Sequence, residues 1–523
     1  MKTGIIPMTQ SGAIQGRPGQ YKSPPFLMMP DVEIQNVTLH ELKANKIPEP
    51  EDINNIPEDY GKELVEVSQR TVGAYAFYCD SVEWDDSVMW GNASYDEKRA
   101  WLDTINKNGD GTKKNPWRNV CYALQQLQCF AENTCCQYFV LFVSGVVNYT
   151  ICYREIVNPS NYDWRNHLIM DGQNADFQMS GRESELRLFS TLKNVIFKNW
   201  DVSAVSNNTL YGFYNCHGFF EKCNISVTSI NERAFAFHGG NYSAFYQCTG
   251  YSDAQKEYTG GWGTMFAYCF QSHNYCIFYQ CNTQTLVNGV NRGISFSDSS
   301  ECIYYQCEAS CDSYSINSNC RLFGFWNITS ASLYSCKLLI GKEAQPIECS
   351  GIKGFTLVSS FLYHCEVFLK GYADYNQTST AFDLWQSRAY HCKAYDVDTG
   401  FNDNDNSLLY YCSVSVNEHT SEKEDVEHIG FSKGNLYNCE CNMSSVVEAS
   451  SAYATVRLYG FQNPESYYNC NISLSGTASA TPYENGKFYE TEEICGFYDS
   501  SGCHDPCHHV YRTKGGTTDY CNS

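Results

Sequence analysis

The sequence has few charged residues, and basic residues are the scarcer kind. Only 18% of its 523 residues are charged, and 36 Lys and Arg against 58 Asp and Glu give a formal net charge of −22 at pH 7. Nucleic-acid binding depends on clustered Lys and Arg at the phosphates, so we expect no nucleic-acid partner. Such an acidic chain stays soluble by repulsion and can recruit divalent cations.

Long apolar runs are also missing. No stretch of 18 apolar residues occurs anywhere in the sequence, so we expect no membrane insertion. Residues 1–10 lack the apolar run of a secretory signal peptide. These absences favour a protein that is made and folded in a reducing cytoplasm.

Cysteine is abundant, with 28 residues, and ten of them end one recurring four-residue phrase. The phrase begins with an apolar residue and reads Phe220-Glu-Lys-Cys223, Phe245-Tyr-Gln-Cys248, Phe278-Tyr-Gln-Cys281, Tyr304-Tyr-Gln-Cys307, Leu333-Tyr-Ser-Cys336, Leu362-Tyr-His-Cys365, Ala389-Tyr-His-Cys392, Leu409-Tyr-Tyr-Cys412, Leu436-Tyr-Asn-Cys439 and Tyr467-Tyr-Asn-Cys470. The intervals between these cysteines are 25, 33, 26, 29, 29, 27, 20, 27 and 31 residues, which is the length of one solenoid coil.

The residues around each cysteine predict short strands. Alternation over Tyr-x-Cys-x-apolar predicts one strand with the aromatic ring and the thiol on the same face. A second phrase, such as Tyr211-Gly-Phe213 or Phe323-Gly-Phe325, lies eight to eleven residues before most of these cysteines and predicts another strand. Like strands of successive coils must then stack in parallel, with the cysteines in an internal ladder of reduced thiols spaced by about 4.8 Å. The residue before each cysteine is often Gln, His or Asn, which predicts side-chain ladders that fix the register.

The chain divides into four regions by composition. Residues 1–70 are rich in Gly and Pro without a period, and we interpret them as an extended attachment arm. Residues 71–185 form an N-terminal cap region with a helix and the first strands, residues 186–475 a parallel β-helix of about eleven coils, and residues 476–523 a Cys- and His-rich cap.

The cap region predicts a helix followed by a buried strand. Asn115 suits the N-cap and Pro116 the first turn, before an apolar stripe that runs from Val120 to Phe130. Residues 138–143, Tyr-Phe-Val-Leu-Phe-Val, read as a fully buried strand.

The turn at residues 109–112, Asn115-Pro-Trp117, the helix and the first strand together resemble the opening of right-handed parallel β-helices of the pectate-lyase-like superfamily. The resemblance implies an all-β solenoid whose open end is covered by the helix. Pectate lyases carry a Trp-Ile-Asp-His phrase, and polygalacturonases carry Asn-Thr-Asp, Gly-His-Gly and Arg-Ile-Lys. None of these phrases is present, so the resemblance assigns no catalytic residue.

Exposed aromatic residues are the leading candidates for a binding site. Long β-helices present a face along which sugars can lie, and Trp and Tyr supply stacking surfaces. The candidates are Tyr258 and Trp262, in a glycine-rich insertion, and Trp326 and Trp385, near the strand after the coil bend. Glycan hydrolysis needs two carboxylates about 5 to 10 Å apart. Asp253, Glu257, Asp298, Glu301 and Asp383 could supply them, but nothing in the sequence pairs any two.

Two clusters could hold a metal ion. Asp403 and Asp405 lie in the run Asn402-Asp-Asn-Asp-Asn406, whose oxygens could bind Ca²⁺, although turns between coils are commonly Asn- and Asp-rich. Cys503 and Cys507, with Cys495 or Cys521 and nearby histidines, could bind Zn²⁺, against the alternative of a packed or disulfide-bonded cap. No other cofactor is expected.

The leading interpretation is a structural protein of a bacteriophage particle that resembles the tailspike or tail-fibre type. It would bind host-surface glycan through a β-helix face and other virion proteins through the arm. The resemblance also implies a homotrimer located in the virion. The alternatives are a glycan depolymerase, either a polysaccharide lyase or a glycoside hydrolase, and an extracellular or cell-surface bacterial adhesin.

Overall fold

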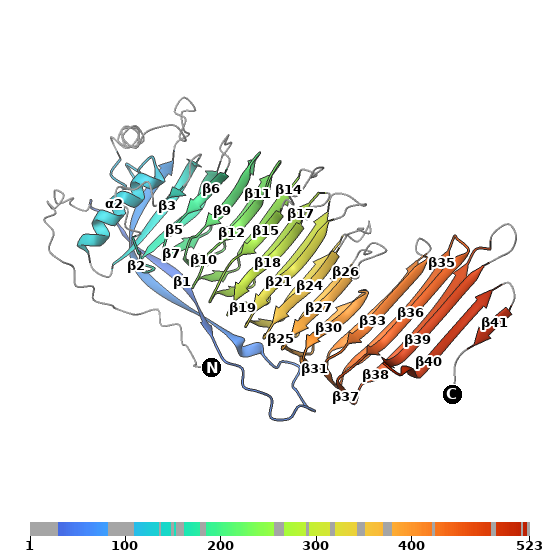
Figure 1. The fold of residues 1–523 in the computed structure, drawn as a ribbon. Coiled ribbons are helices and arrows are strands. Elements are labelled where there is room, and N and C mark those ends of the chain that lie inside the picture. Colours follow the sequence, from blue (N-terminus) through green and yellow to red (C-terminus); the bar gives the residue numbers. More distant parts are fainter. Residues whose placement is uncertain are drawn as a thin grey trace.

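The protein is an elongated parallel β-solenoid. The computed structural model describes residues 30–81, 109–134, 137–147, 151–152, 162–177, 185–255, 266–288, 292–313, 320–341, 351–369, 379–420, 424–482, 488–513 and 516–519. Its strands stack in about ten turns along one long axis (Figure 1). The all-β solenoid predicted from the repeat is therefore confirmed. Within the described ranges no helix is long and apolar enough to cross a membrane.

Three sheets run along the solenoid, with one strand from each in every complete coil. Sheet 1 contains, in spatial order, β1 (Ile34–Ala44), β2 (Val65–Ser81), β3 (Tyr138–Val147), β5 (Leu168–Phe177), β7 (Val195–Lys198), β10 (Gly218–Glu221), β13 (Ala244–Tyr246), β16 (Ile277–Tyr279), β19 (Ile303–Tyr305), β22 (Ser332–Tyr334), β25 (Phe361–Tyr363), β28 (Arg388–Tyr390), β31 (Leu408–Tyr410), β34 (Asn435–Tyr437) and β37 (Ser466–Tyr468).

Sheet 2 contains β8 (Asp201–Ser206), β11 (Asn224–Ser229), β14 (Thr249–Ala254), β17 (Asn282–Val287), β20 (Glu308–Ser313), β23 (Lys337–Ile340), β26 (Glu366–Leu369), β29 (Lys393–Tyr395), β32 (Ser413–Thr420), β35 (Glu440–Ala449) and β38 (Asn471–Ala480). Sheet 3 contains β4 (Ile151–Cys152), β6 (Glu185–Ser190), β9 (Thr209–Tyr214), β12 (Ala234–His238), β15 (Phe266–Gln271), β18 (Arg292–Ser300), β21 (Arg321–Thr329), β24 (Gly351–Val358), β27 (Ser379–Trp385), β30 (Thr399–Asp405), β33 (Asp425–Ser432), β36 (Tyr453–Gln462), β39 (Tyr489–Asp499), β40 (Gly502–Thr513) and β41 (Gly516–Asp519).

The cysteine phrase spans a bend, where the sequence predicted a single strand. Sheet 1 strands end on the residue two positions before the cysteine, and sheet 2 strands start one position after it. The intervening residue, Gln247 for example, is left-handed with a φ of 52°. This residue resets the alternation, so Phe245 and Cys248 both point into the core while Tyr246 lies on the outer face. The prediction that this tyrosine shares the thiol's face is wrong.

The ten phrase cysteines line one corner of the core. Nine are fully buried free thiols, and Cys470 in the last coil is partly exposed. Nine of the ten thiols reach a carbonyl of the preceding coil; Cys248 Sγ, for example, lies 3.3 Å from Phe220 O. Burial raises the pKa of Cys281, Cys336 and Cys392, which keeps these thiols protonated.

Amide ladders at the bend, predicted from the residue before cysteine, are confirmed. Gln247 Nε2 donates to Gln280 Oε1 at 2.9 Å, and Gln280 Nε2 donates to Gln306 Oε1 at 2.9 Å. Asn469 Nδ2 donates to Asn438 Oδ1 at 2.7 Å, near the other end of the solenoid. Because each amide binds the same position one coil away, the ladders lock neighbouring coils in register.

Residues 45–64, which we call the strap, lie along the outer face of sheet 1. They join β1 to β2, which pair antiparallel from Ile34↔Tyr75 to Ala44↔Val65. The strap covers a row of outward tyrosines, Tyr305, Tyr334, Tyr363, Tyr390 and Tyr410. Figure 1 shows this segment, in blue, extending from the ends of β1 and β2 along the side of the solenoid.

Specific contacts hold the strap on the solenoid. The Tyr60 ring packs edge-on against Tyr363 and Tyr390, and Arg388 Nη1 lies 2.6 Å from Glu49 Oε1. Gly61 has a φ of 93°, and a Cβ there would lie 2.6 Å from the Tyr363 ring, so the site requires glycine. The described part of the expected attachment arm therefore binds its own solenoid, because Ile56 and Leu64 bury apolar surface on the tyrosine row.

The two ends of the solenoid differ. Helix α2 (Val120–Asn133) packs its apolar side on the core at the N-terminal end. Its N-cap is Asn119, which accepts a hydrogen bond from Tyr122 N at 3.0 Å, so the predicted cap at Asn115 is wrong. Parallel stacking already includes β2, β3 and β5, before the predicted start at residue 186. At the C-terminal end, β40 and β41 extend sheet 3 as an antiparallel meander.

One buried histidine gives the fold a pH dependence. His273 is 1% exposed among Phe245, Phe270 and Phe278, and burial lowers its pKa from 6.5 to about 4. The unfolded chain therefore binds the extra proton between pH 6.5 and 4, so the free energy of unfolding falls as the pH drops through this window. We expect His273 to contribute a slope of at most about 1.4 kcal/mol per pH unit. Urea unfolding measured between pH 4 and 7 should show a shallower dependence on pH for His273→Gln than for the unsubstituted protein.

Candidate functional site

The described tryptophans predicted to stack on sugars both lie on sheet 3. Trp326 is half-buried on β21, with its ring centroid 4.2 Å from that of Phe323. Trp385, also half-buried, is the last residue of β27, two coils further along the sheet. Tyr258 and Trp262 lie outside the described residues. Sheet 3 is therefore the face on which a site can be built.

A continuous row of aromatic and apolar side chains covers the first half of the outer face of sheet 3. These residues, which we call the aromatic row, are Tyr211, Phe235, Tyr268, Ile294 and Phe323, in register from β9 to β21. They form a cluster separate from the core, and Phe266 and Trp326 pack against it. Tyr211, Phe266 and Trp326 are half-buried and the other four are buried, so these three rings offer stacking surface.

Polar side chains run beside the aromatic row. His238, Gln271, Ser297 and Trp326 are in register on β12, β15, β18 and β21. His238 Nδ1 and Ser297 Oγ are buried and have no hydrogen-bond partner in the described structure. Burial lowers the pKa of His238, so the imidazole is neutral at pH 7, and burial raises the pKa of Tyr268 to about 12. Hydrogen-bonding capacity next to aromatic rings is what a sugar ring requires.

Arginines border the same face and were not among the predicted site residues. The Arg187 guanidinium carbon lies 3.7 Å from the centre of the Tyr214 ring. Arg233 and Arg292 lie 5.2 and 5.5 Å from the centre of the Phe266 ring. A sequence pattern marks Arg233, Arg292 and Arg321. Each stands four residues before a phenylalanine that points into the core, as in Arg321-Leu-Phe-Gly-Phe325.

The carboxylates considered for hydrolysis do not form a pair in the described structure. Asp298 accepts hydrogen bonds from Asn327 Nδ2 at 2.9 Å and from Gln271 Nε2 at 3.2 Å. Asp383 lies 2.5 Å from Lys353 Nζ and also accepts bonds from two asparagine amides. The two aspartates are three coils apart, or roughly 14 Å, beyond the range for paired glycosidase carboxylates.

The remaining acidic candidates lie elsewhere. Asp253 is on sheet 2, where its Oδ2 accepts a bond from Gln255 Nε2 at 3.0 Å. Glu301 is exposed at the bend from sheet 3 to sheet 1, beside Tyr275. Glu257 lies outside the described residues.

Asp403 and Asp405, considered for calcium, have structural partners. Asp403 is 1% exposed and accepts backbone bonds from Asp405 N at 3.1 Å and Ser407 N at 2.9 Å, which hold the turn into sheet 1. Asp405 Oδ2 accepts from Gln386 Nε2 at 2.7 Å. The described residues contain no group of three or more His, Cys, Asp or Glu placed to hold a metal ion.

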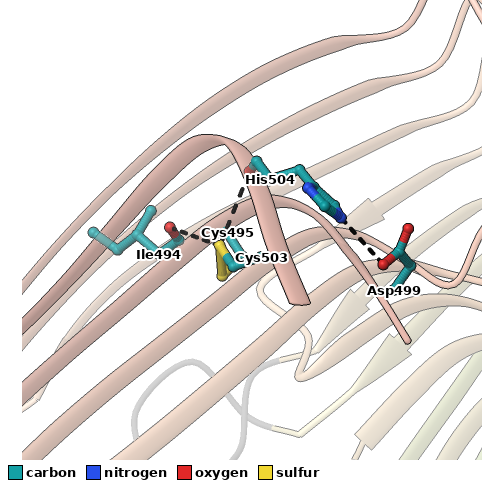
Figure 2. The surroundings of a disulfide bond; sticks show 5 residues. All are labelled: Ile494, Cys495, Asp499, Cys503 and His504. Carbon is teal, nitrogen blue, oxygen red and sulfur yellow. Dashed lines mark hydrogen bonds and ion pairs between the residues drawn. A yellow bond between two sulfur atoms is a disulfide. The ribbon is translucent and has the colours of Figure 1, made fainter. Parts of the chain in front are cut away.

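At the C-terminal end, Cys503 forms a disulfide with Cys495 across β39 and β40 (Figure 2). Both sulfurs are therefore unavailable as thiolate ligands for zinc. Next to it, His504 Nε2 lies 3.1 Å from Asp499 Oδ1, and hydrogen bonds from Ser501 and His504 lower the pKa of Asp499 to about 2. Cys507 lies on β40 opposite Cys495, and its side chain and Cys521 are outside the described set.

Comparison with known proteins yields structural matches alone. No family model matches the chain, and no curated protein matches it. The crystal structure of PfbA, a surface adhesin of Streptococcus pneumoniae, matches with 8% identity over 77% of this chain and 96% of that chain, at a TM-score of 0.29. ORF18 of Geobacillus virus E2 matches with 10% identity over 60% of this chain and 63% of that chain, also at a TM-score of 0.29. At this level of similarity, function must be argued from the residues of the site.

Proposed function

We propose that the protein binds host-surface glycan through the outer face of sheet 3, as a virion protein of tailspike or fibre type. The observation that carries this proposal is the aromatic row with Trp326 and Phe266 packed against it, beside the polar residues His238 and Ser297. Aromatic rings stack on the apolar faces of sugars, and unpaired polar atoms bind their hydroxyls. The free thiols of the core fit a chain that folds in a reducing cytoplasm before assembly.

A binding measurement on arrayed bacterial capsules and lipopolysaccharides tests the proposal. Trp326→Ala and Tyr211→Ala should each weaken binding about tenfold, because each removes a stacking surface. Tyr453→Ala is the matched control, since Tyr453 is 49% exposed on sheet 3 but far from the row and stacks on Tyr489. Unchanged affinity for Trp326→Ala and Tyr211→Ala, or no binding to any surface glycan, would refute the proposal.

A bacterial surface adhesin is the second candidate, favoured by the Cys495–Cys503 disulfide. Disulfides persist in oxidising compartments outside the cytoplasm. Immediate alkylation of thiols in the producing cell, followed by mass spectrometry, separates the candidates. A disulfide already formed before release from the cell favours the exported adhesin, whereas alkylated Cys495 and Cys503 favour cytoplasmic folding into a particle.

A further inference from the structure

A row of arginines occupies one edge of the outer face of sheet 3. Phe266, Arg292 and Arg321 stand at the same position of β15, β18 and β21. Arg233 stands at this position in the preceding coil, because the next residue, Ala234, pairs with Ala267. We call Arg233, Arg292 and Arg321 the arginine row. Neighbouring positions are about 4.8 Å apart, and Phe266 separates Arg233 from Arg292.

The charge of this row is not neutralised by any residue that the structure describes. None of the three guanidinium groups has an ion pair with a described residue, and Arg292 Nε is buried without a hydrogen-bond partner. Other arginines of the same chain are paired: Arg457 with Asp425 at 3.0 Å, and Arg512 with Glu492 at 2.6 Å. Adjacent like charges on a sheet repel, so Arg292 and Arg321 side by side disfavour the empty site. An anion bound between them would remove that cost.

The arginine row and the aromatic row share one face. Arg292 is two residues before Ile294 and Arg321 is two residues before Phe323, and in both strands the intervening residue is buried. Two residues of strand span about 7 Å, so a ligand stacked on the aromatic row can place a substituent over the guanidinium groups. A guanidinium fork binds the two oxygens of a carboxylate, sulfate or phosphate group simultaneously.

We propose that the ligand of this face is an acidic glycan, whose acid groups bind the arginine row while its sugar rings lie on the aromatic row. This inference rests on the proposed glycan binding and adds the chemical class of the ligand. It also explains how a chain with a net charge of −22 can bind a polyanion, since the arginine row gathers three cationic groups on one edge of sheet 3.

Isothermal titration of the full chain with four polysaccharides tests the proposal: hyaluronan for carboxylate, dextran sulfate for sulfate, a teichoic acid for phosphate, and neutral dextran as reference. At least one acidic polymer should bind about tenfold or more tightly than dextran, and the three acidic probes identify the acid group. Arg292→Gln and Arg321→Gln should each lose about tenfold in affinity for that polymer. Raising the ionic strength from about 0.05 to about 0.5 M should weaken the same interaction.

Two controls separate this inference from the proposed function. Arg457→Gln, a paired arginine on the same sheet, should leave the affinity unchanged. Trp326→Ala should weaken binding of every glycan that binds. Loss with Trp326→Ala but not with the arginine variants would overturn the acidic-glycan inference and leave glycan binding standing. If the arginine variants and Trp326→Ala all bind with the affinity of the unsubstituted protein, both the acidic-glycan inference and the proposed glycan binding are overturned. If free sulfate binds as tightly as the polymer and this binding depends on the arginines, the site is a simple anion site and the glycan assignment is overturned.

Discussion

Replacing Glu221 with alanine is expected to lower the free energy of unfolding by about 3–5 kcal/mol, the usual cost of breaking a buried ion pair. Glu221 is 2% exposed on the outer face of sheet 1, where its Oε1 lies 3.0 Å from Lys198 Nζ and 3.1 Å from His40 Nδ1. Lys198 Nζ also donates to Thr38 O at 2.6 Å, so this cluster attaches β1 to the solenoid. Without the carboxylate, the mostly buried ammonium of Lys198 keeps the Thr38 carbonyl as a hydrogen-bond partner and Asp171 on the neighbouring strand as a nearby charge.

Urea unfolding of three variants checks this expectation. Glu66→Ala breaks an exposed ion pair in which the Lys43 side chain is 68% exposed and the Glu66 side chain 56% exposed. It should lower the free energy of unfolding by less than about 1 kcal/mol. The double substitution Glu221→Met with Lys198→Met should recover most of the loss, because apolar replacements of both partners remove the uncompensated charge. A cost below about 1 kcal/mol for Glu221→Ala would show that the pair contributes no net stability.

The cysteine interval was sufficient to predict the coil, but the bend within the phrase was not recognised. The apolar residue at its start and the cysteine at its end are both inward, and the residue between Tyr and Cys is nearly always polar. Two inward residues three positions apart do not fit one strand, so the pattern itself held the signal for a left-handed residue. The signal is weak because Gln, as at Gln247, is uncommon in that conformation.

The strap could not have been predicted from periodicity. Its contacts join residues more than 240 positions apart, such as Tyr305 Oη with Lys62 O at 3.0 Å and Tyr411 with Asn54. The strap itself contains no regular element beyond the short 3₁₀ turn η1 (Lys62–Leu64). From its sequence alone, a polar, proline-containing segment with a few apolar residues is predicted to be a linker. Its packing on the solenoid becomes evident only once the structure shows the tyrosine row that it covers.

The proposed binding face was only partly predictable from the sequence. Trp326 could be proposed from the sequence because a tryptophan is by itself a candidate stacking residue. The arginine row could not, because it is formed by the register between strands that are separated in the sequence by insertions of different length. Arg292 and Arg321 are 29 positions apart in the sequence, but they are neighbours in space because they stand at the same position of successive coils. Aligning the chain on its inward phenylalanines, Phe296 and Phe325, would have placed them together.

Replacing Phe325 with alanine is expected to cost about 3–5 kcal/mol of unfolding free energy, the usual range for a buried phenylalanine. Phe325 is fully buried on β21 in the middle of an inward phenylalanine column. Its ring stacks on Phe296 at 4.8 Å and Phe355 at 4.6 Å and meets the edge of Tyr304 at 5.5 Å. A cavity there removes contacts from two neighbouring coils at once, because coils in a solenoid are stabilised through their immediate neighbours.

The end of the same column supplies the matched comparison. Phe497 on β39 is half-buried, stacks on Phe461 at 5.1 Å and has no further coil beyond it within the described structure. Phe497→Ala should therefore cost less than half as much as Phe325→Ala in urea unfolding. Hydrogen exchange should locate the lost protection of Phe325→Ala in β18, β21 and β24, the three coils that its ring joins. Lost protection confined to β21 would mean that each phenylalanine of the column acts by its own burial, whereas loss that extends into β18 and β24 would establish that stacking between coils holds the solenoid together.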